Sequence, residues 1–245
     1  MMQSAPLNIT EAPSPNFDDR TLPISVLVLH YTGMETGAAA LKRMQDPDAK
    51  VSAHYMIEED GTIFRLVDEE KRAWHAGVGS WNGVTNINSN SIGIEIVNGG
   101  HDYGLPDFPD VQIMAVIALS KDIITRHKIA ARNVVGHSDI APERKTDPGE
   151  KFPWAGLAAA GIGLFPQSIS EDRRILFEAG DRDRGVAIAQ SGLAHIGYGA
   201  QVSGIMDAGT VKIVEALQRR WRADAVTGAI DIQTMDIIRK LSERT

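Results

Sequence analysis

The sequence contains no cysteine in its 245 residues. This absence excludes a disulfide framework, a thiol nucleophile and a metal site built on thiolates. It does not identify a cellular compartment, because a chain without thiols is insensitive to the redox state around it. Any bound metal ion must therefore use histidine, aspartate or glutamate as its ligands.

A basic surface and a long apolar run are lacking as well. The formal net charge is -7, and residues of both signs are mixed along the chain, so we expect no basic stripe that would bind nucleic acid. No apolar run approaches the roughly 20 residues that a membrane-spanning helix needs. We therefore predict neither a nucleic-acid partner nor a membrane-spanning segment.

Two further signals are missing. The first twenty residues, MMQSAPLNITEAPSPNFDDR, have neither the basic start nor the continuous apolar centre of a signal peptide. The chain also shows no internal repeat and no sustained heptad pattern, and we expect a monomer on that ground.

The first part of the chain alternates between short apolar runs and amphipathic segments. This alternation predicts an α/β fold with a mixed central sheet flanked by helices. We expect strands over 24–29, 91–97 and 133–136, a hairpin of 52–57 and 62–67, helices over 37–44 and 109–128, and a loop over the Gly- and Asn-rich residues 77–90.

The composition changes after Trp154, where small residues over 155–164 are typical of a linker. Beyond it the pattern is helical and predicts a small all-α domain of three helices. Its candidate helical stretches are 173–178, 183–196, 208–221 and 232–241. The expected organisation is a lead of residues 1–20, a main domain of 21–160, a linker of 161–172 and a helical domain of 173–245.

Three residues have the right chemistry and placement for a metal site. His30 closes a buried strand, His137 follows another, and Asp147 lies in the turn sequence Lys145-Thr146-Asp147-Pro148-Gly149. Two histidines and an aspartate match a zinc site whose fourth position stays open. Spacing alone is weak support, because the histidines could equally hydrogen-bond backbone carbonyls and the aspartate could cap a turn. His54 fits a packing role better than a fourth ligand.

Six sequence segments, taken together, are more specific evidence than the spacing of three single residues. In this order the chain carries LVLHYTG, SAHYMIEEDGTIFRLV, AWHAGVGSWNG, NSNSIGIEIVN, VVGHSDIAPERKTDPG and KFPW. The set, over about residues 22–157, strongly resembles the type 2 N-acetylmuramoyl-L-alanine amidases, the AmpD- and AmiD-like family that also includes the peptidoglycan recognition proteins. The resemblance implies an enzyme of cell-wall turnover or recycling that hydrolyses the amide between the lactyl group of N-acetylmuramic acid and the L-Ala of the stem peptide.

The same resemblance implies roles for individual residues. It assigns His30, His137 and Asp147 as ligands of Zn²⁺, Glu95 as the general base and Lys145 as a second catalytic residue. The physical pattern agrees for Glu95, because the alternation of Ile92, Ile94 and Ile96 puts it on the opposite face of its strand. Weaker candidates, which we expect to bind substrate through aromatic or polar side chains in a groove, are Tyr31, Trp74, His75 and Asn98, with Trp81 beside them.

The C-terminal segment resembles a peptidoglycan-binding domain 1 module. The similarity rests on Gly197-Tyr198-Gly199, on Leu217-Gln218 within a helix and on Gly228 to Asp231, with Leu217 in place of the usual aromatic. A generic three-helix bundle is the alternative.

Peptidoglycan or muropeptides are the expected partners, and a wall-binding module favours the cell envelope or periplasm, whereas the missing signal peptide favours the cytoplasm. A non-catalytic recognition protein and a phage-type endolysin remain as alternative functions.

Overall fold

The computed structural model describes residues 7–244, so Thr245 and the first six residues of the expected lead 1–20 lie outside it. The chain divides into two compact units, one formed by Met1–Gly77 with Asn88–Ala130 and the other by Val78–Ile87 with Ala131–Thr245.

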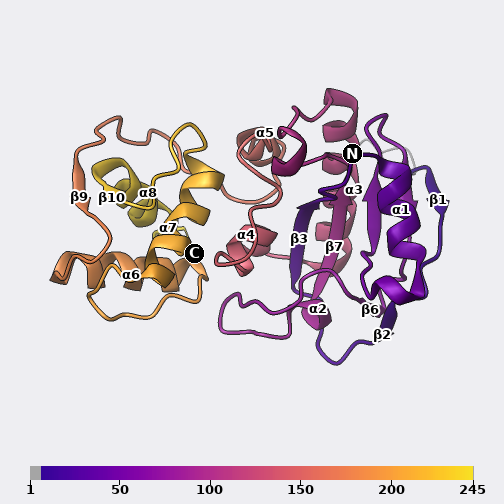
Figure 1. The fold of residues 1–245 in the computed structure, drawn as a ribbon, viewed down its shortest axis with the longest axis horizontal. Coiled ribbons are helices and arrows are strands. Elements are labelled where there is room, and N and C mark those ends of the chain that lie inside the picture. Colours follow the sequence, from indigo (N-terminus) through magenta and orange to yellow (C-terminus); the bar gives the residue numbers. More distant parts are fainter. Residues whose placement is uncertain (1–6, 245) are drawn as a thin grey trace. The chain divides into compact units, whose positions relative to one another are not determined.

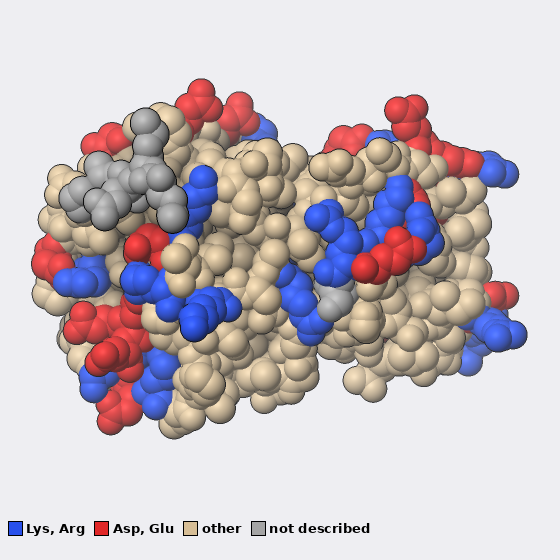
Figure 2. Space-filling view, turned by 180° about the vertical axis from the view of Figure 1, so that it is seen from behind, with Lys and Arg blue, Asp and Glu red and all other residues tan. Residues whose placement is uncertain are grey.

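Within the described residues, no helix is long and apolar enough to cross a membrane. On the face drawn in Figure 2, basic and acidic side chains are interspersed and form no continuous basic stripe.

A mixed six-stranded sheet is the centre of the fold, which confirms the predicted α/β class. Its strand order is β1-β5-β4-β7-β3-β8. The pairs β1/β5, β4/β7 and β3/β7 are parallel, whereas β4/β5 is antiparallel. The strands are β1 (Ile9–Glu11), β3 (Val26–Tyr31), β4 (Tyr55–Ile57), β5 (Ile63–Arg65), β7 (Ser91–Ile96) and β8 (Val134–Gly136), and β2 (Phe17–Asp19) pairs with β6 (Lys71–Ala73) in a separate sheet.

Strands β3 and β7 run side by side in the sheet (Figure 1), and both were expected from their apolar sequences. Leu27, Val28 and Leu29 are fully buried, which explains why β3 is a continuous apolar run rather than an alternating one. The register pairs His30 of β3 with Glu95 of β7. Because directly paired residues of neighbouring strands point to the same face, the sheet itself places these two side chains next to each other.

The predicted hairpin is present, with shorter strands than expected. Strands β4 and β5 pair antiparallel, and the turn between them is closed by a hydrogen bond from the Glu58 amide to the Thr62 carbonyl at 2.9 Å. Asp60 accepts from the Thr62 amide at 2.9 Å, and Gly61 has a φ of 86°, a left-handed conformation that glycine adopts without strain.

The predicted helices of the first unit are also confirmed. Helix α1 (Gly37–Gln45) begins where the Thr36 hydroxyl accepts from the Ala39 amide, and helix α3 (Asp110–His127) buries Val116, Leu119 and Ile123. Short helical turns occupy Ile87–Asn90 (α2), Pro47–Ala49, His101–Tyr103 and Ala131–Asn133. The loop expected over 77–90 therefore ends in α2, a single helical turn that is too short to leave a periodic pattern.

The second unit contains α4 (His137–Ile140) and α5 (Trp154–Ala159), so the segment expected to be a linker over 155–164 begins as a helix. Leu157 is fully buried on α5, which explains why this stretch is ordered. Helices α6 (Arg184–Ile196), α7 (Ala208–Trp221) and α8 (Ile232–Ser242) confirm three of the expected helices. The prediction of a helix over 173–178 is wrong, because part of this segment forms the strand β9 (Ile175–Phe177), which pairs with β10 (Ile230–Asp231).

The Glu69 carboxylate lies at the centre of a cluster of charged and polar side chains in the first unit. Its side chain is only 12% exposed. It accepts hydrogen bonds from Tyr55 Oη at 2.8 Å and Arg126 Nη2 at 2.8 Å and lies 2.6 Å from His127 Nε2. Burial alone would raise the pKa of Glu69, but the hydrogen bonds from Arg126, His127 and Tyr55 outweigh it and lower this pKa to about 2. Its contribution to stability is therefore present above about pH 4.5 and is lost as the pH falls towards 2.

We expect Glu69→Gln to lower the free energy of unfolding at pH 7 by up to about 3 kcal/mol and to lower it much less near pH 2.5, where the wild-type carboxylate has begun to accept its proton. Urea unfolding at both pH values measures this difference. The exposed Glu59→Gln serves as the control. An equal destabilisation by Glu69→Gln at both pH values would contradict the assignment.

Candidate metal centre

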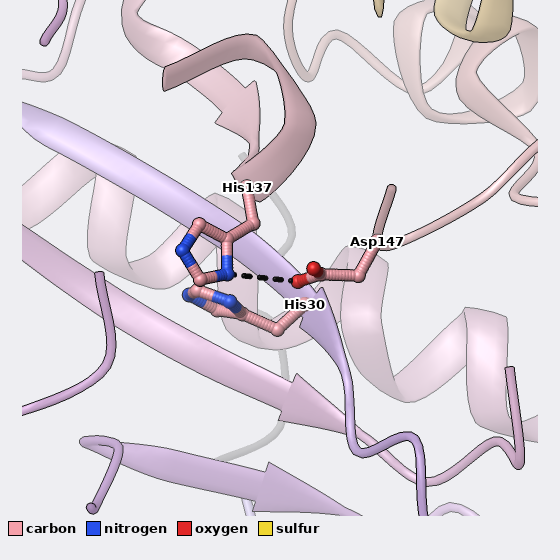
Figure 3. Close-up of side chains that lie close together, drawn as sticks. All are labelled: His30, His137 and Asp147. Atoms are coloured by element: carbon pink, nitrogen blue, oxygen red, sulfur yellow. Dashed lines mark hydrogen bonds and ion pairs between the residues drawn. The ribbon is translucent and has the colours of Figure 1, made fainter. Parts of the chain in front are cut away.

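His30, His137 and Asp147 come together as a buried group (Figure 3), and their potential ligand atoms all lie within 4.8 Å of one another. Their exposed fractions are 1%, 3% and 5%. A buried carboxylate in such a place requires a compensating positive charge. Ligand atoms around a tetrahedral zinc ion are separated by about 3.4 Å, so small adjustments would allow these three to share one ion. The donor set therefore fits a divalent metal with at least one open position.

His30 is held by the strand that carries it and by a chain of two further contacts. Its Nε2 atom lies 3.0 Å from His75 Nδ1, and His75 Nε2 lies 3.1 Å from Ser91 Oγ. A histidine ligand typically uses its second ring nitrogen for such a contact, which fixes the tautomer and the direction of the ring. Because His75 contacts Nε2 of His30, Nδ1 is the nitrogen that His30 would offer to a metal.

Gly93 makes this arrangement possible. It lies between Ser91 and Glu95 on one face of β7, and a Cβ atom at position 93 would lie 2.5 Å from the His75 ring. Only a residue without a side chain leaves room for that imidazole. Ser91, Gly93 and Glu95 therefore share a face that serves the candidate site, whereas Ile92, Ile94 and Ile96, on the other face, are fully buried in the core.

His137 and Asp147 are connected to each other. His137 Nδ1 lies 3.1 Å from Asp147 Oδ2 (Figure 3), and the amide of Ser138 donates to the carbonyl of Asp147 at 2.9 Å. Asp147 sits in a tight turn in which the Gly149 amide donates to the Thr146 carbonyl at 3.0 Å. The turn predicted from the sequence is therefore present, and its backbone is fixed to α4 by the Ser138 contact.

Glu95 is half-buried and borders a cavity of about 280 Å³. The cavity has a mixed lining, in which apolar Met34, Ala40, Met44 and Val51 lie beside Thr32, Arg43 and Glu95 itself. Because Glu95 is the register partner of His30, the carboxylate stands at the boundary between the candidate metal ligands and an open space.

Lys145 is half-buried and lies two residues before Asp147. Its amide donates to the carbonyl of Ala141 at 3.1 Å, in a turn that directly precedes the turn of the candidate ligand Asp147. The neighbouring Arg144 donates instead to the carbonyl of Val78 through Nε at 2.9 Å.

The four weaker candidates occupy different settings. His75 is buried against His30 as described above. Asn98 is 2% exposed and uses its amide within the chain, donating to Pro106 O at 2.9 Å and accepting from the Gly100 amide at 2.9 Å. Tyr31 Oη lies 3.0 Å from His101 Nδ1, and Trp74 is half-buried. A role of these four residues in substrate binding stays a prediction.

Two other residues singled out in the sequence belong to the core. Trp81 is 1% exposed and packs edge-to-face on Tyr198 with ring centroids 5.2 Å apart, so it offers no face to a ligand. His54 lies outside the three-residue group. Its Nδ1 atom accepts from the Gly93 amide at 2.9 Å, and burial lowers the pKa of His54 to about 3, so it is neutral and supports β7.

Two features of the site were not identified from the sequence. One is the contact of His75 with His30. The other is Asp139, which is 1% exposed and whose Oδ2 atom accepts from the Gly136 amide at 2.8 Å, just before the candidate ligand His137. The sequence did offer a signal for both, because His75 lies within AWHAGVGSWNG and Asp139 within VVGHSDIAPERKTDPG, two of the six family segments.

Comparison with known proteins identifies relatives over most of the chain. Residues 20–150 match the family described as N-acetylmuramoyl-L-alanine amidase. The chain is 36% identical over 239 residues to the N-acetylmuramoyl-L-alanine amidase AmiD of Escherichia coli, covering 90% of this chain and 83% of that protein. It is 40% identical over 167 residues to the 1,6-anhydro-N-acetylmuramyl-L-alanine amidase AmpD of Citrobacter freundii, covering 60% of this chain and 87% of the relative.

A solved structure extends the similarity to three dimensions. The complex of E. coli AmiD with the substrate anhydro-N-acetylmuramic acid-L-Ala-D-gamma-Glu-L-Lys superimposes with a TM-score of 0.78 at 35% sequence identity. The match covers 90% of this chain and 89% of that one, so it extends well beyond the six-stranded sheet into the C-terminal helices.

Proposed function

The chain belongs to the N-acetylmuramoyl-L-alanine amidase family, and from this premise we propose that it is a zinc enzyme that releases stem peptides from muropeptides. As an amidase of this kind it hydrolyses the bond between the lactyl group of N-acetylmuramic acid and L-Ala. The buried group of His30, His137 and Asp147 is the observation that carries the proposal.

The ligand set supports zinc in particular. Two neutral imidazoles and one carboxylate are typical of catalytic zinc sites, and the cysteine-free sequence provides no softer ligand. When bound there, zinc would supply Lewis acidity, which makes water a competent nucleophile near neutral pH and polarises a carbonyl. The remaining chemistry falls to the side chains around it.

Glu95 is the proposed general base. It stands beside His30 in the sheet and borders the cavity, so a water molecule between the substrate and the metal ligands can lose its proton to this carboxylate. The same carboxyl group can then return the proton to the departing amine of L-Ala. One group thus serves both halves of the amide hydrolysis.

Lys145 is the proposed stabiliser of the transition state. Attack on the amide carbonyl builds negative charge on its oxygen, and an ammonium group close to that oxygen can offset the charge. The sequence position of Lys145, two residues before the candidate ligand Asp147, supports this role.

We expect Lys145→Met to lower kcat by about 10²–10³-fold and to leave the zinc content unchanged, because the substituted side chain is no ligand. Steady-state kinetics on a purified muropeptide, with metal analysis of the same sample, measures both quantities. Lys121→Met on the exposed surface of α3 is the control. A kcat within a few-fold of the wild type would exclude this role for Lys145.

The proposed substrates are muropeptides with a 1,6-anhydro end. E. coli AmiD binds such a compound in its solved complex, and the AmpD relative is named for the same sugar. The cavity beside Glu95, with its mixed polar and apolar lining, provides space for part of the stem peptide next to the scissile bond.

We further propose that residues 173–245 form a helical domain that binds polymeric peptidoglycan, which would place the protein in the cell envelope. The pattern of Gly197-Tyr198-Gly199, Gln218 and Asp231 supports the domain. Gln218 is fully buried and accepts from the amides of Thr227 and Gly228, and Asp231 caps α8 by accepting from the Thr234 amide at 2.7 Å. These pattern residues stabilise the three-helix arrangement itself.

One experiment tests substrate and chemistry together. Purified sacculi and an anhydromuropeptide are incubated with zinc-loaded protein, with and without a chelator, and mass spectrometry follows free stem peptides that begin at L-Ala. Release that the chelator abolishes supports the zinc amidase. Release from the anhydromuropeptide alone would assign a soluble substrate and contradict the wall-binding domain. No release from either substrate by zinc-loaded protein would favour the non-catalytic recognition protein.

A further inference from the structure

Asp139 connects the candidate ligand His137 to the C-terminal helices. It lies on α4, two residues after His137, and is 1% exposed. Its Oδ2 atom accepts from the Gly136 amide at 2.8 Å and from Arg220 Nη1 at 2.7 Å, and its Oδ1 atom accepts from Tyr198 Oη at 2.6 Å. Both oxygens of this buried carboxylate thus accept hydrogen bonds from residues of the second unit.

Arg220 comes from α7 and contacts the chain on both sides of His137. Besides Asp139, it donates through Nη2 to the carbonyl of Val134 on β8 at 2.7 Å. Its guanidinium group lies between the rings of Trp154 and Trp221, 4.2 Å and 4.3 Å from their centroids. These contacts leave the guanidinium little freedom to move.

Tyr198 is the second contact from the C-terminal segment. It is 3% exposed and its ring packs on Trp81. Burial and the neighbouring Asp139 carboxylate raise the pKa of Tyr198, so its hydroxyl stays protonated and donates to that carboxylate.

Stability alone is a poor explanation for this network. Burying an arginine and an aspartate costs desolvation energy, and an apolar replacement of such a pair is often as stable. What the ionic pair adds is fixed geometry, because its hydrogen bonds have defined directions. The fixed atoms here are Val134 O, three residues before His137, and the Asp139 carboxylate, two residues after it. His137 begins α4 between these two points.

We propose that Arg220 and Tyr198 are positioning residues for the zinc ligand His137, acting through Asp139. The inference rests on the proposed zinc site. It makes the C-terminal helices a necessary part of the metal centre, in addition to any role in binding the cell wall. Among the hydrogen bonds and ion pairs of the described residues, none joins Arg220 or Tyr198 to His30, His137 or Asp147.

The C-terminal segment offers a matched control. Arg222 and Asp231 form a second buried ion pair, with side chains 2% and 7% exposed, and Arg222 also donates to the carbonyl of Ala225. No hydrogen bond of Arg222 reaches α4 or β8 among those of the described residues. Loss of the ion pair between Arg222 and Asp231 should destabilise the C-terminal helices without moving His137.

The test uses the full-length protein with the substitutions Arg220→Met, Tyr198→Phe and Arg222→Met. For each, the zinc Kd is measured by chelator competition, Tm is measured for the metal-free protein, and kcat is measured per bound zinc. We expect Arg220→Met to weaken zinc binding by about 10–100-fold and Tyr198→Phe to weaken it by about 3–10-fold. Arg222→Met should lower Tm and leave the zinc Kd within about twofold of the wild type.

Tyr198→Phe keeps the packed ring, so it decides the question if Arg220→Met does not fold. A lowered Tm with an unchanged zinc Kd and an unchanged kcat per zinc in both variants would overturn the inference and leave a purely structural pair. Equal weakening of zinc binding by Arg222→Met would overturn it as well. A wild-type protein that binds no zinc would instead overturn the proposed function, and this inference with it.

Discussion

Asp147→Ala is expected to abolish zinc binding at micromolar concentrations of the metal and to lower hydrolysis by at least about 10³-fold. Asp147 provides the single negative charge of the ligand group, and without it two neutral imidazoles remain. The backbone contact of Ser138 with residue 147 does not depend on the side chain, so the turn should persist. The loss should therefore come from the metal and not from unfolding.

Metal analysis after dialysis, circular dichroism and muropeptide hydrolysis together measure this effect. Asp48→Ala, an exposed aspartate in the turn after α1, is the matched control and should behave as the wild type. If Asp147→Ala retained one zinc per chain and full turnover, the metal centre would have to lie elsewhere.

Glu95→Gln is expected to lower kcat by about 10²–10⁴-fold with little change in the zinc Kd or in KM. Glutamine keeps the shape of the side chain and its place beside His30, but it cannot accept a proton. The effect should therefore be confined to the chemical step. This separates Glu95 from the ligands, whose loss removes the metal as well.

Kinetics and zinc titration of Glu95→Gln test that separation, with the exposed Glu59→Gln as the control. A residual kcat above about a tenth of the wild type would show that another group accepts the proton. Loss of zinc from Glu95→Gln would show that this carboxylate is itself a ligand.

The candidate metal ligands could be singled out because each lies in or beside a segment with a strong local signal. His30 ends a continuous apolar run, and Asp147 lies in a Pro-Gly turn. Composition contributed too, since a chain without cysteine limits the ligand types. Spacing alone could not select His30 and His137 from the seven histidines, and the six family segments provided that selection.

The partners of the ligands could not be predicted from local patterns. The contact of His75 with His30 depends on the space above Gly93, and a glycine within a strand indicates a close approach without saying of what. The pair of Asp139 and Arg220 joins residues that are 81 positions apart. Neither contact has a period or spacing that a sequence shows.

The failed helix prediction has a similar cause. Residues 173–178 read as Arg-Arg-Ile-Leu-Phe-Glu, a composition that a helix accepts readily. In the structure Ile175–Phe177 form β9 because Ile230 and Asp231 provide a pairing partner more than fifty residues further along the chain. Tertiary context overrode local propensity, as it commonly does for short segments.

The most direct test of the central claim is a zinc titration of the metal-free protein during hydrolysis of an anhydromuropeptide, with the products identified by mass spectrometry. Release of a stem peptide beginning at L-Ala should rise with zinc and saturate at one ion per chain. Hydrolysis that proceeds at full rate without zinc, or zinc bound at one ion per chain with neither the anhydromuropeptide nor sacculi cleaved, would contradict that claim.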